Sequence, residues 1–200
     1  MTNWAGPVVA YAVASRLVYV GWVGFALRRE ERTQYFTRTF GVERGFRRFR
    51  LWTMIVMRND AASLILTCIL TRNTLNIGIP PVVEWLAGGA LIVIGFGTKE
   101  WAARTLGNDA YYWHNFFEPG SHAAPNPPGP YRYIKNPMYT IGYLHAYGLA
   151  IVFDSAWGLV VTLFAQLGIL AFHRLVEQPH YERLTVAAAS PGSPSPSATR

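Results

Sequence analysis

Apolar residues gather in five stretches of roughly membrane-spanning length, with short polar segments between them. A hydrophobic run of about 20 residues matches the thickness of a bilayer core, about 30 Å. The expected spans cover about residues 8–27, 51–70, 82–101, 137–153 and 156–176. Only Asp154 and Ser155 separate the last two, which therefore form a C-terminal helical hairpin. The pattern predicts an all-α fold, a polytopic membrane helical bundle of about five transmembrane helices.

The polar segments between these stretches differ in character. The segment Arg28–Arg50 is dense in Arg with aromatic residues between, which predicts a helical connection at the membrane surface that contacts anionic lipid headgroups. Residues 73–81 form a turn, and prolines at 125, 127, 128 and 130 exclude a regular helix from that part of Gly107–Lys135. We expect one membrane domain over residues 1–186 and a disordered, low-complexity tail over residues 187–200.

Charge supports a membrane location and suggests an orientation. Charged residues make up 14% of the chain, against about 25% in ordinary globular proteins. The net charge of +7 comes mostly from Arg, and much of it lies in Arg28–Arg50, so it indicates membrane topology rather than nucleic-acid binding. By the positive-inside rule, this segment, residues 104–135 and the region after Arg174 lie in the cytoplasm. The small size and bare N-terminus favour a bacterial inner membrane, with the active site on its cytoplasmic side.

Cysteine and histidine usage excludes two kinds of site. Cys68 is the only cysteine, so an intrachain disulfide is impossible. The five histidines show no HxxxH or HExxH spacing, and we expect no metal. Arg16, Arg58 and Asp60 are charged residues inside the first two spans. An Arg–Asp ion pair between these two helices is their expected, structural role.

Asn136-Pro137 carries the signals of a helix start at the head of the fourth span. Asn is a favoured N-cap and Pro a favoured first helical residue. Free backbone N–H groups at such a start can bind a carboxylate or phosphate, and Arg132 and Lys135 add positive charge beside it. A plain membrane-helix start with snorkelling basic residues is an equally good interpretation.

Aromatic residues accumulate before and along the fourth span. Tyr139, Tyr143 and Tyr147 form a stripe, and Gly142 begins a four-residue spacing of small residues that allows close helix packing. Seven aromatic residues precede the stripe: Tyr111, Tyr112, Trp113, Phe116, Phe117, Tyr131 and Tyr133. Aromatic faces attract sulfonium and quaternary ammonium cations, although such a stripe is more often simple packing.

One face of the fifth span is polar. Gln166, His173 and Glu177 are spaced by seven and four residues, which places them on one side of an otherwise apolar helix. Ionisable groups in membrane helices usually face the protein interior or a polar cavity. Because Gln178-Pro179-His180-Tyr181 follows directly, we favour a functional role over a structural one, with the carboxylate binding a ribose diol or an ammonium group.

These residues resemble a known family, the integral-membrane methyltransferases, which include isoprenylcysteine carboxyl methyltransferase and phosphatidylethanolamine N-methyltransferase. The likeness to the phospholipid enzymes covers about residues 107–184. Their N/H-P-M-Y motif matches Asn136, Pro137, Met138 and Tyr139. Their Y-W-x-D/N-F-F-like stretch matches Tyr112, Trp113, His114, Asn115, Phe116 and Phe117. Their E-x-P-H ending matches Glu177, Pro179 and His180.

The resemblance implies S-adenosylmethionine as methyl donor, held before the fourth span and at the end of the fifth, in a catalytic half over about residues 100–184. The donor-site residues expected are Tyr131, Arg132, Tyr133, Asn136, Pro137, Met138, Tyr139, Gly142, His173, Glu177, His180 and Tyr181. A membrane phospholipid is the expected acceptor: methyl transfer goes to the amine of phosphatidylethanolamine or its methylated forms, towards phosphatidylcholine. For the base that deprotonates this amine, His114 is the first candidate, followed by Glu118 and Asp109.

Two departures and three alternatives accompany this hypothesis. Many family members carry two acidic residues where this chain has Glu177-Gln178, and others carry Gly-Asp where it has His114-Asn115. The second departure bears on which residue is the base. Carboxyl methylation of a prenylcysteine or similar small lipophilic acceptor is the alternative of the same class. An NADPH-dependent sterol-type reductase and a non-catalytic membrane scaffold are the alternatives of other classes.

Overall fold

The computed structural model describes residues 4–118 and 129–189. Four of its helical segments are long and apolar enough to cross a membrane. They are α1 (Ala5–Thr33), α3 (Val42–Leu70), α4 (Pro81–Leu106) and the continuous segment Ala156–Val186. A shorter apolar segment, Ile141–Val152, accompanies them. The predicted fold class, a polytopic all-α membrane bundle, is therefore confirmed for the described part of the chain.

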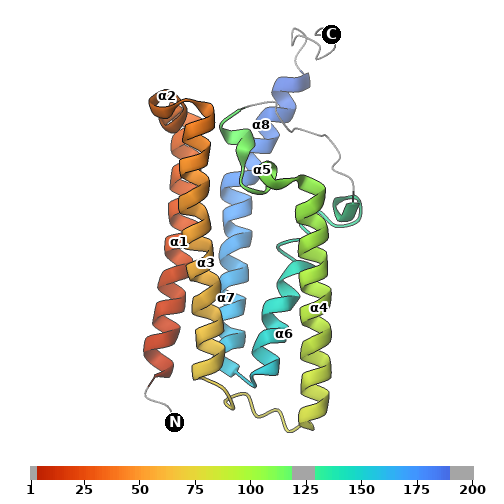
Figure 1. Ribbon diagram of the computed structural model, residues 1–200. Helices are drawn as coiled ribbons and strands as arrows, with labels where there is room; N and C mark the ends of the chain where they lie inside the picture. The colour runs from red at the N-terminus through yellow and green to blue at the C-terminus, as the bar shows by residue number, and fades with distance from the viewer. Residues whose placement is uncertain (1–3, 119–128, 190–200) are drawn as a thin grey trace.

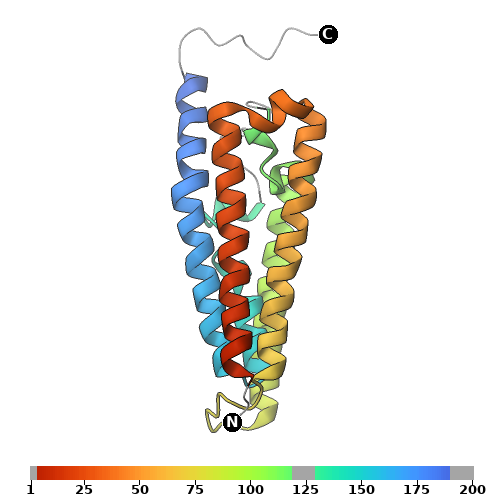
Figure 2. The ribbon, with the colours of Figure 1, turned by 90° about the vertical axis from the view of Figure 1, so that its left-hand side faces the viewer.

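The long helices stand side by side, and the small elements gather at one end. Figures 1 and 2 show α1, α3 and the last long segment as neighbours, with α4 and the short α6 (Leu144–Val152) beside them. The short helices α2 (Tyr35–Phe40) and α5 (Asn108–Tyr111) lie at the end of the bundle where α8 (Gln178–Ala189) also lies. The Arg-rich segments therefore share one end, as the topology prediction requires.

The Arg-rich connection is helical, as predicted, but its limits differ. The first helix continues to Thr33 and the third begins at Val42, so both spans extend well into Arg28–Arg50. The last span also continues beyond residue 176. A π-helical turn, η4 (His173–Glu177), joins α7 (Ala156–Phe172) to α8 without a break. The expected disordered tail thus begins with helical residues up to 189, and residues 190–200 lie outside the described part.

The prediction that the fourth span starts at Asn136-Pro137 is wrong. One turn follows Asn136, whose carbonyl accepts from the N–H groups of Tyr139 and Thr140, and Thr140 then leaves helical geometry with φ −108° and ψ −93°. A 3₁₀ turn, η3 (Ile141–Tyr143), leads into α6, which has only nine residues. Nine helical residues span about 14 Å, under half a bilayer core. Irregular backbone therefore enters the bundle, which is tolerated only where protein buries it.

Close contact between α4 and α6 depends on glycine. A Cβ built on Gly95 would overlap the backbone of His145, and one built on Gly148 would overlap the backbone of α4. Small residues let membrane helices approach closely and gain dispersion contacts along their length. Small residues thus allow the close packing, but the tightest contacts are at Gly95 and Gly148, which lie outside the spacing that begins at Gly142.

Gly95→Ala should destabilise the protein by about 1–3 kcal/mol, because the added methyl group must push α4 away from α6. Gly97→Ala is the matched control, since a Cβ there meets nothing within 4 Å. Unfolding of both variants in mixed detergent micelles measures the difference. Equal stability of the two variants would contradict the proposed contact.

The predicted ion pair between the first two spans is confirmed. Arg16 Nη2 of α1 lies 2.6 Å from Asp60 Oδ2 of α3, and both side chains are 10% exposed. Beside this pair, Asn59 Nδ2 donates to Ser15 Oγ at 2.7 Å. Polar contacts therefore fix the register of α1 against α3.

Candidate active site

A buried carboxylate, Glu177, joins three separate parts of the chain. The indole N–H of Trp113 donates to its Oε1 at 2.5 Å, and the hydroxyl of Tyr139 donates to the same oxygen at 2.7 Å. His173 Nδ1 lies 2.5 Å from the other oxygen, Oε2. Glu177 is 5% exposed. A carboxylate offers about four acceptor positions, so three protein partners leave room for one more donor.

The backbone around Glu177 departs from an α-helix for a reason that is visible in the sequence. Pro179 has no N–H and cannot bond the carbonyl of Leu175 four residues earlier. Arg28 of α1 donates to that carbonyl instead, with Nη2 3.0 Å from the oxygen. The helix widens into the π-turn His173–Glu177 at this position. Such π-bulges are frequent at functional sites.

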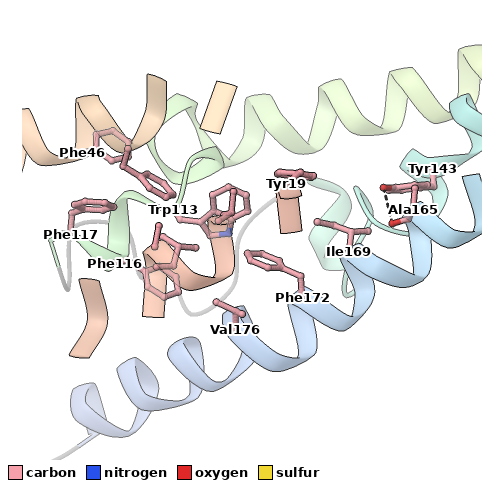
Figure 3. Close-up of a cluster of buried hydrophobic side chains, with 14 of the residues drawn as sticks. Tyr19, Phe46, Trp113, Phe116, Phe117, Tyr143, Ala165, Ile169, Phe172 and Val176 are labelled. Atoms are coloured by element: carbon pink, nitrogen blue, oxygen red, sulfur yellow. Dashed lines mark hydrogen bonds between the residues drawn. The ribbon is translucent and has the colours of Figure 1, made fainter. Parts of the chain in front are cut away.

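Trp113 reaches the carboxylate from an unusual backbone conformation. Its φ of 60° and ψ of 37° are left-handed, which is uncommon for a residue other than glycine. Figure 3 shows its indole directed toward α7, where its ring centroid lies 5.5 Å from that of Phe172. The strained turn between α5 and η1 (His114–Phe116) therefore aims the indole N–H at Glu177.

The tyrosine stripe and the polar face of the fifth span, predicted separately, meet each other. Tyr143 donates to the carbonyl of Ala165 at 3.3 Å, and Tyr147 donates to Gln166 Oε1 at 2.7 Å. Gln166 Nε2 donates in turn to the carbonyl of Tyr139 at 3.1 Å. Two of the tyrosines therefore hold the irregular segment and α6 against α7, while Tyr139 alone extends to Glu177.

A second polar contact joins the end of the chain to α1. His180 Nδ1 and Arg183 Nη2 each lie 2.7 Å from Glu31 Oε1. The imidazole of His180 stacks on the ring of Phe116, with centroids 3.6 Å apart and planes at 14°. These contacts hold α8 against α1 and η1 next to the Glu177 cluster.

Three buried polar atoms near Glu177 have no hydrogen-bond partner among the described residues. They are Asn115 Oδ1, Tyr131 Oη and His180 Nε2. Burial, together with Tyr181 and Glu177, raises the pKa of the Tyr131 hydroxyl, so it stays protonated and able to donate. Buried polar atoms normally find partners, so these three atoms are available to hydrogen-bond a bound water, ion or ligand.

The three candidate bases have different surroundings. His114 is buried, with its ring edge-to-face against Phe46 at 4.5 Å between centroids. Asp109 is 54% exposed at its side chain and lies 3.4 Å from Arg50 Nη1. Glu118 is exposed at the end of the described segment. Trp113, the residue before His114, contacts Glu177 directly.

Several of the twelve expected donor-site residues are brought together, and others are not. Five of them form one cluster: Glu177 is the buried carboxylate, Tyr139 and His173 contact it, and Tyr131 and His180 carry two of the unsatisfied atoms beside it. Pro137 and Gly142 are buried backbone positions, and Met138 lines a cavity with Tyr139. Arg132, which lies over the ring of Tyr133, is exposed, and Tyr133 itself is 75% exposed. Asn136 is half-buried and contributes its carbonyl, and Tyr181 is 43% exposed.

Sequence reasoning missed the direct roles of Trp113 and Glu31. Trp113 is one of seven aromatic residues before the fourth span, and no local pattern in the sequence assigns a partner to its indole N–H. Glu31 lies in a segment dense in Arg. An acidic residue in a basic segment is itself a signal of ion pairing, and here Glu31 pairs with His180 and Arg183. The contact of each with its partner joins residues more than 60 positions apart, which no local spacing reveals.

Comparison with known proteins places these residues in context. Residues 83–184 match the family model described as phospholipid methyltransferase. Phosphatidylethanolamine N-methyltransferase of Schizosaccharomyces pombe is 35% identical over 97 residues, 48% of this chain and 11% of that protein. The enzyme of the same name from Schizosaccharomyces japonicus is 26% identical over 189 residues, 90% of this chain and 20% of that protein.

A third relative carries the same name, and all three are much longer than this chain. Phosphatidylethanolamine N-methyltransferase of Scheffersomyces stipitis is 28% identical over 146 residues, 68% of this chain and 17% of that protein. The chain therefore spans between 11% and 20% of the length of these three curated relatives. No solved structure matches the chain. The resemblance drawn from the motifs at residues 107–184 is confirmed, and the match extends back to residue 83.

Proposed function

Because the chain belongs to the phospholipid methyltransferase family, we propose that it transfers a methyl group from S-adenosylmethionine to the amine of phosphatidylethanolamine or its partly methylated forms. Family membership implies a methyltransferase, and the apolar helices are long enough to cross a membrane, which favours this function over the reductase and scaffold alternatives. The finer choice of donor and acceptor is our proposal. The observation that carries it is the buried Glu177 carboxylate, held by Trp113, Tyr139 and His173.

The residues around Glu177 fit S-adenosylmethionine. That molecule carries an ammonium group, a carboxylate, ribose hydroxyls and a sulfonium centre. Glu177 accepts from an ammonium or a ribose diol, and the unsatisfied atoms of Asn115, Tyr131 and His180 offer both acceptor and donor positions. The rings of Trp113 and Tyr139 are held at the carboxylate by their N–H and hydroxyl groups, and aromatic rings attract cations through their faces. When bound, the donor supplies an electrophilic methyl group on sulfur.

The protein has two tasks toward the acceptor. The amine of phosphatidylethanolamine is normally protonated, with a pKa of roughly 10, and it becomes nucleophilic only after losing a proton. Burial beside aromatic residues lowers that pKa, because it disfavours the charged form. A side chain within hydrogen-bond reach then accepts the proton, and His114 remains our first candidate, before Glu118 and Asp109. Alignment of amine, methyl and sulfur in one line supplies much of the rate.

Replacement of His114 by Ala tests this assignment. We expect the rate at neutral pH to fall about 100-fold, and to recover in part at high pH, where the amine deprotonates unaided. The measurement is the pH–rate profile of methyl transfer to phosphatidylethanolamine. His114→Phe keeps an aromatic ring against Phe46 and separates lost packing from lost basicity. An unchanged rate with a normal pH profile in His114→Ala would exclude His114 as the base.

The same profile distinguishes amine from carboxyl methylation. A carboxyl acceptor is already ionised at neutral pH, so its methylation needs no base and the rate should not vary there. A rate that rises with pH supports the amine, and a flat profile with a prenylcysteine acceptor supports the alternative.

We also propose that the α2 end of the bundle faces the cytoplasm of a bacterial inner membrane. Exposed arginines cover the surface at this end: Arg32, Arg38, Arg44, Arg47 and Arg48. At the same end, Arg29 and Arg48 lie over the rings of Tyr35 and Phe40, at 3.7 and 4.1 Å from the ring centroids. Arg beside aromatic residues is suited to the headgroup layer, where it attracts anionic lipids.

A further inference from the structure

A cavity of about 260 Å³ lies inside the bundle beside the Glu177 cluster. Residues from α1, α3, α4, α7 and the irregular segment before α6 line it. Its polar and aromatic lining includes Arg16, Asp60, Lys99, Trp113, Tyr139 and Tyr143. None of the functions assigned above uses its charged residues.

The charges in this cavity do not cancel. Arg16 is paired with Asp60 at 2.6 Å, but its Nε is buried and has no partner among the described residues. Lys99 also lines the cavity, and no carboxylate of the described residues lies within ion-pair distance of its ammonium. His145, which lines it too, directs Nδ1 at the carbonyl of Gly142. Two cations thus face one carboxylate, an arrangement that favours a singly charged anion.

Two lining residues connect the cavity to the proposed reaction site. Trp113 and Tyr139 line the cavity, and both donate to Glu177. Apolar side chains of Leu64, Ile65 and Leu149 complete other parts of the lining. The cavity therefore combines positive charge, aromatic faces and apolar surface, the three features that match the phosphate, amine and hydrocarbon parts of a phospholipid.

We propose that this cavity binds the phosphodiester of the acceptor lipid, with Lys99 and Arg16 as its cationic partners and the lipid amine turned toward Trp113 and Tyr139. The inference rests on the proposed function, because it supplies the acceptor half of that site. Lys99 donates to a phosphate oxygen, and Arg16 adds its free Nε–H while Asp60 holds its guanidinium. The cavity then selects amines that carry a phosphate over amines that do not.

Binding of phosphatidylethanolamine to the purified full chain in mixed micelles of an uncharged detergent tests the proposal. Wild-type protein should bind the lipid saturably, and Lys99→Gln should weaken the affinity about tenfold or more, because a charge-assisted hydrogen bond is lost. Lys99→Arg should restore most of it. Arg104→Gln is the matched control: it removes a cation from the same helix, but one that is exposed and paired with Glu100, so its affinity should change less than about twofold.

Two further ligands identify what Lys99 recognises. A long-chain alkylamine without phosphate should bind Lys99→Gln as well as wild type. Inorganic phosphate should not displace the lipid at millimolar concentration, since it lacks the amine and the hydrocarbon. Two results would overturn the assignment of a lipid phosphodiester. One is an equal loss of affinity for phosphatidylethanolamine and for the alkylamine in Lys99→Gln, and the other is displacement of the lipid by inorganic phosphate alone.

The outcomes separate this inference from the proposed function. If wild type methylates phosphatidylethanolamine while Lys99→Gln binds and methylates it normally, the inference fails and the function stands. If the lipid binds in a Lys99-dependent way but receives no methyl group, the inference stands and the function fails. Folded wild-type protein that binds no phospholipid would overturn the inference.

Discussion

Glu177→Gln is expected to weaken S-adenosylmethionine binding about 100-fold and to reduce methyl transfer at least as much. The substitution keeps the size of the side chain but removes the charge that faces the donor. Trp113 and Tyr139 both donate to Oε1, so the amide oxygen of Gln can still accept from them, and its NH₂ then replaces Oε2 opposite His173 Nδ1. Hydrogen bonds to charged groups contribute about 1.5–3 kcal/mol each, which corresponds to the expected change. Isothermal titration of the donor into purified protein measures it.

Glu182→Gln is the control for this experiment. It lies on the same helix, is exposed and accepts from Gln178 Nε2 at 2.9 Å, away from the buried cluster. Its donor affinity should equal that of wild type. Thermal unfolding of both variants shows whether any loss arises from an unfolded site. A wild-type donor affinity in Glu177→Gln would remove Glu177 from the donor site.

Asp60→Leu should destabilise the protein by about 3–5 kcal/mol, because it leaves the Arg16 guanidinium buried without its partner. Arg16→Met combined with Asp60→Leu removes both charges, and most of the lost stability should return. Unfolding in mixed micelles with increasing sodium dodecyl sulfate measures these differences. The exposed pair Arg104–Glu100 provides the comparison, since its removal should change stability by less than about 1 kcal/mol.

The same double variant separates two roles of Arg16. Its stability should recover while its affinity for phosphatidylethanolamine stays low, because Arg16 is also proposed to contact the lipid phosphate. If the stability of the double variant does not recover, the ion pair stabilises the protein more than the apolar side chains that replace it. Asp60→Leu as stable as wild type would contradict the buried ion pair itself.

Much of the bundle could be predicted because its signals are local. Apolar runs fix where helices cross the membrane, and Arg density fixes which ends lie together. The pairing of Arg16 with Asp60 followed from the cost of leaving a charge alone in an apolar span. The contact of His173 with Glu177 followed from their i,i+4 spacing, and the π-turn preserves it.

The short fourth helix could not be predicted in the same way. Asn136-Pro137 starts a turn, as its residue types require, but a local helix start says nothing about how far the helix continues. Here the chain leaves helical geometry at Thr140. Tyr139 reaches Glu177 from this turn, while Gln166 holds its carbonyl. Those contacts join positions 27 and 38 residues apart. The point at which the helix ends is therefore set by tertiary contacts, which no local pattern predicts.

The site extends beyond the segment that resembles known methyltransferases. The family match covers residues 83–184, from α4 to α8. Outside it, α1 provides Glu31 to His180 and Arg28 to the π-turn, and it carries Arg16 into the cavity. The first helix therefore supports the proposed donor site through Glu31 and Arg28, and it contributes Arg16 to the proposed acceptor site. Sequence motifs concentrated in the second half of the chain did not reveal this.

The most direct test of the account is incubation of the purified protein with S-adenosylmethionine labelled in its methyl group and with mixed lipids that contain phosphatidylethanolamine, followed by separation of the lipids. The account predicts label in mono-, di- or trimethylated phosphatidylethanolamine with wild type, and little or none with Glu177→Gln. A folded wild-type protein that binds the donor but leaves every phospholipid unlabelled would contradict it.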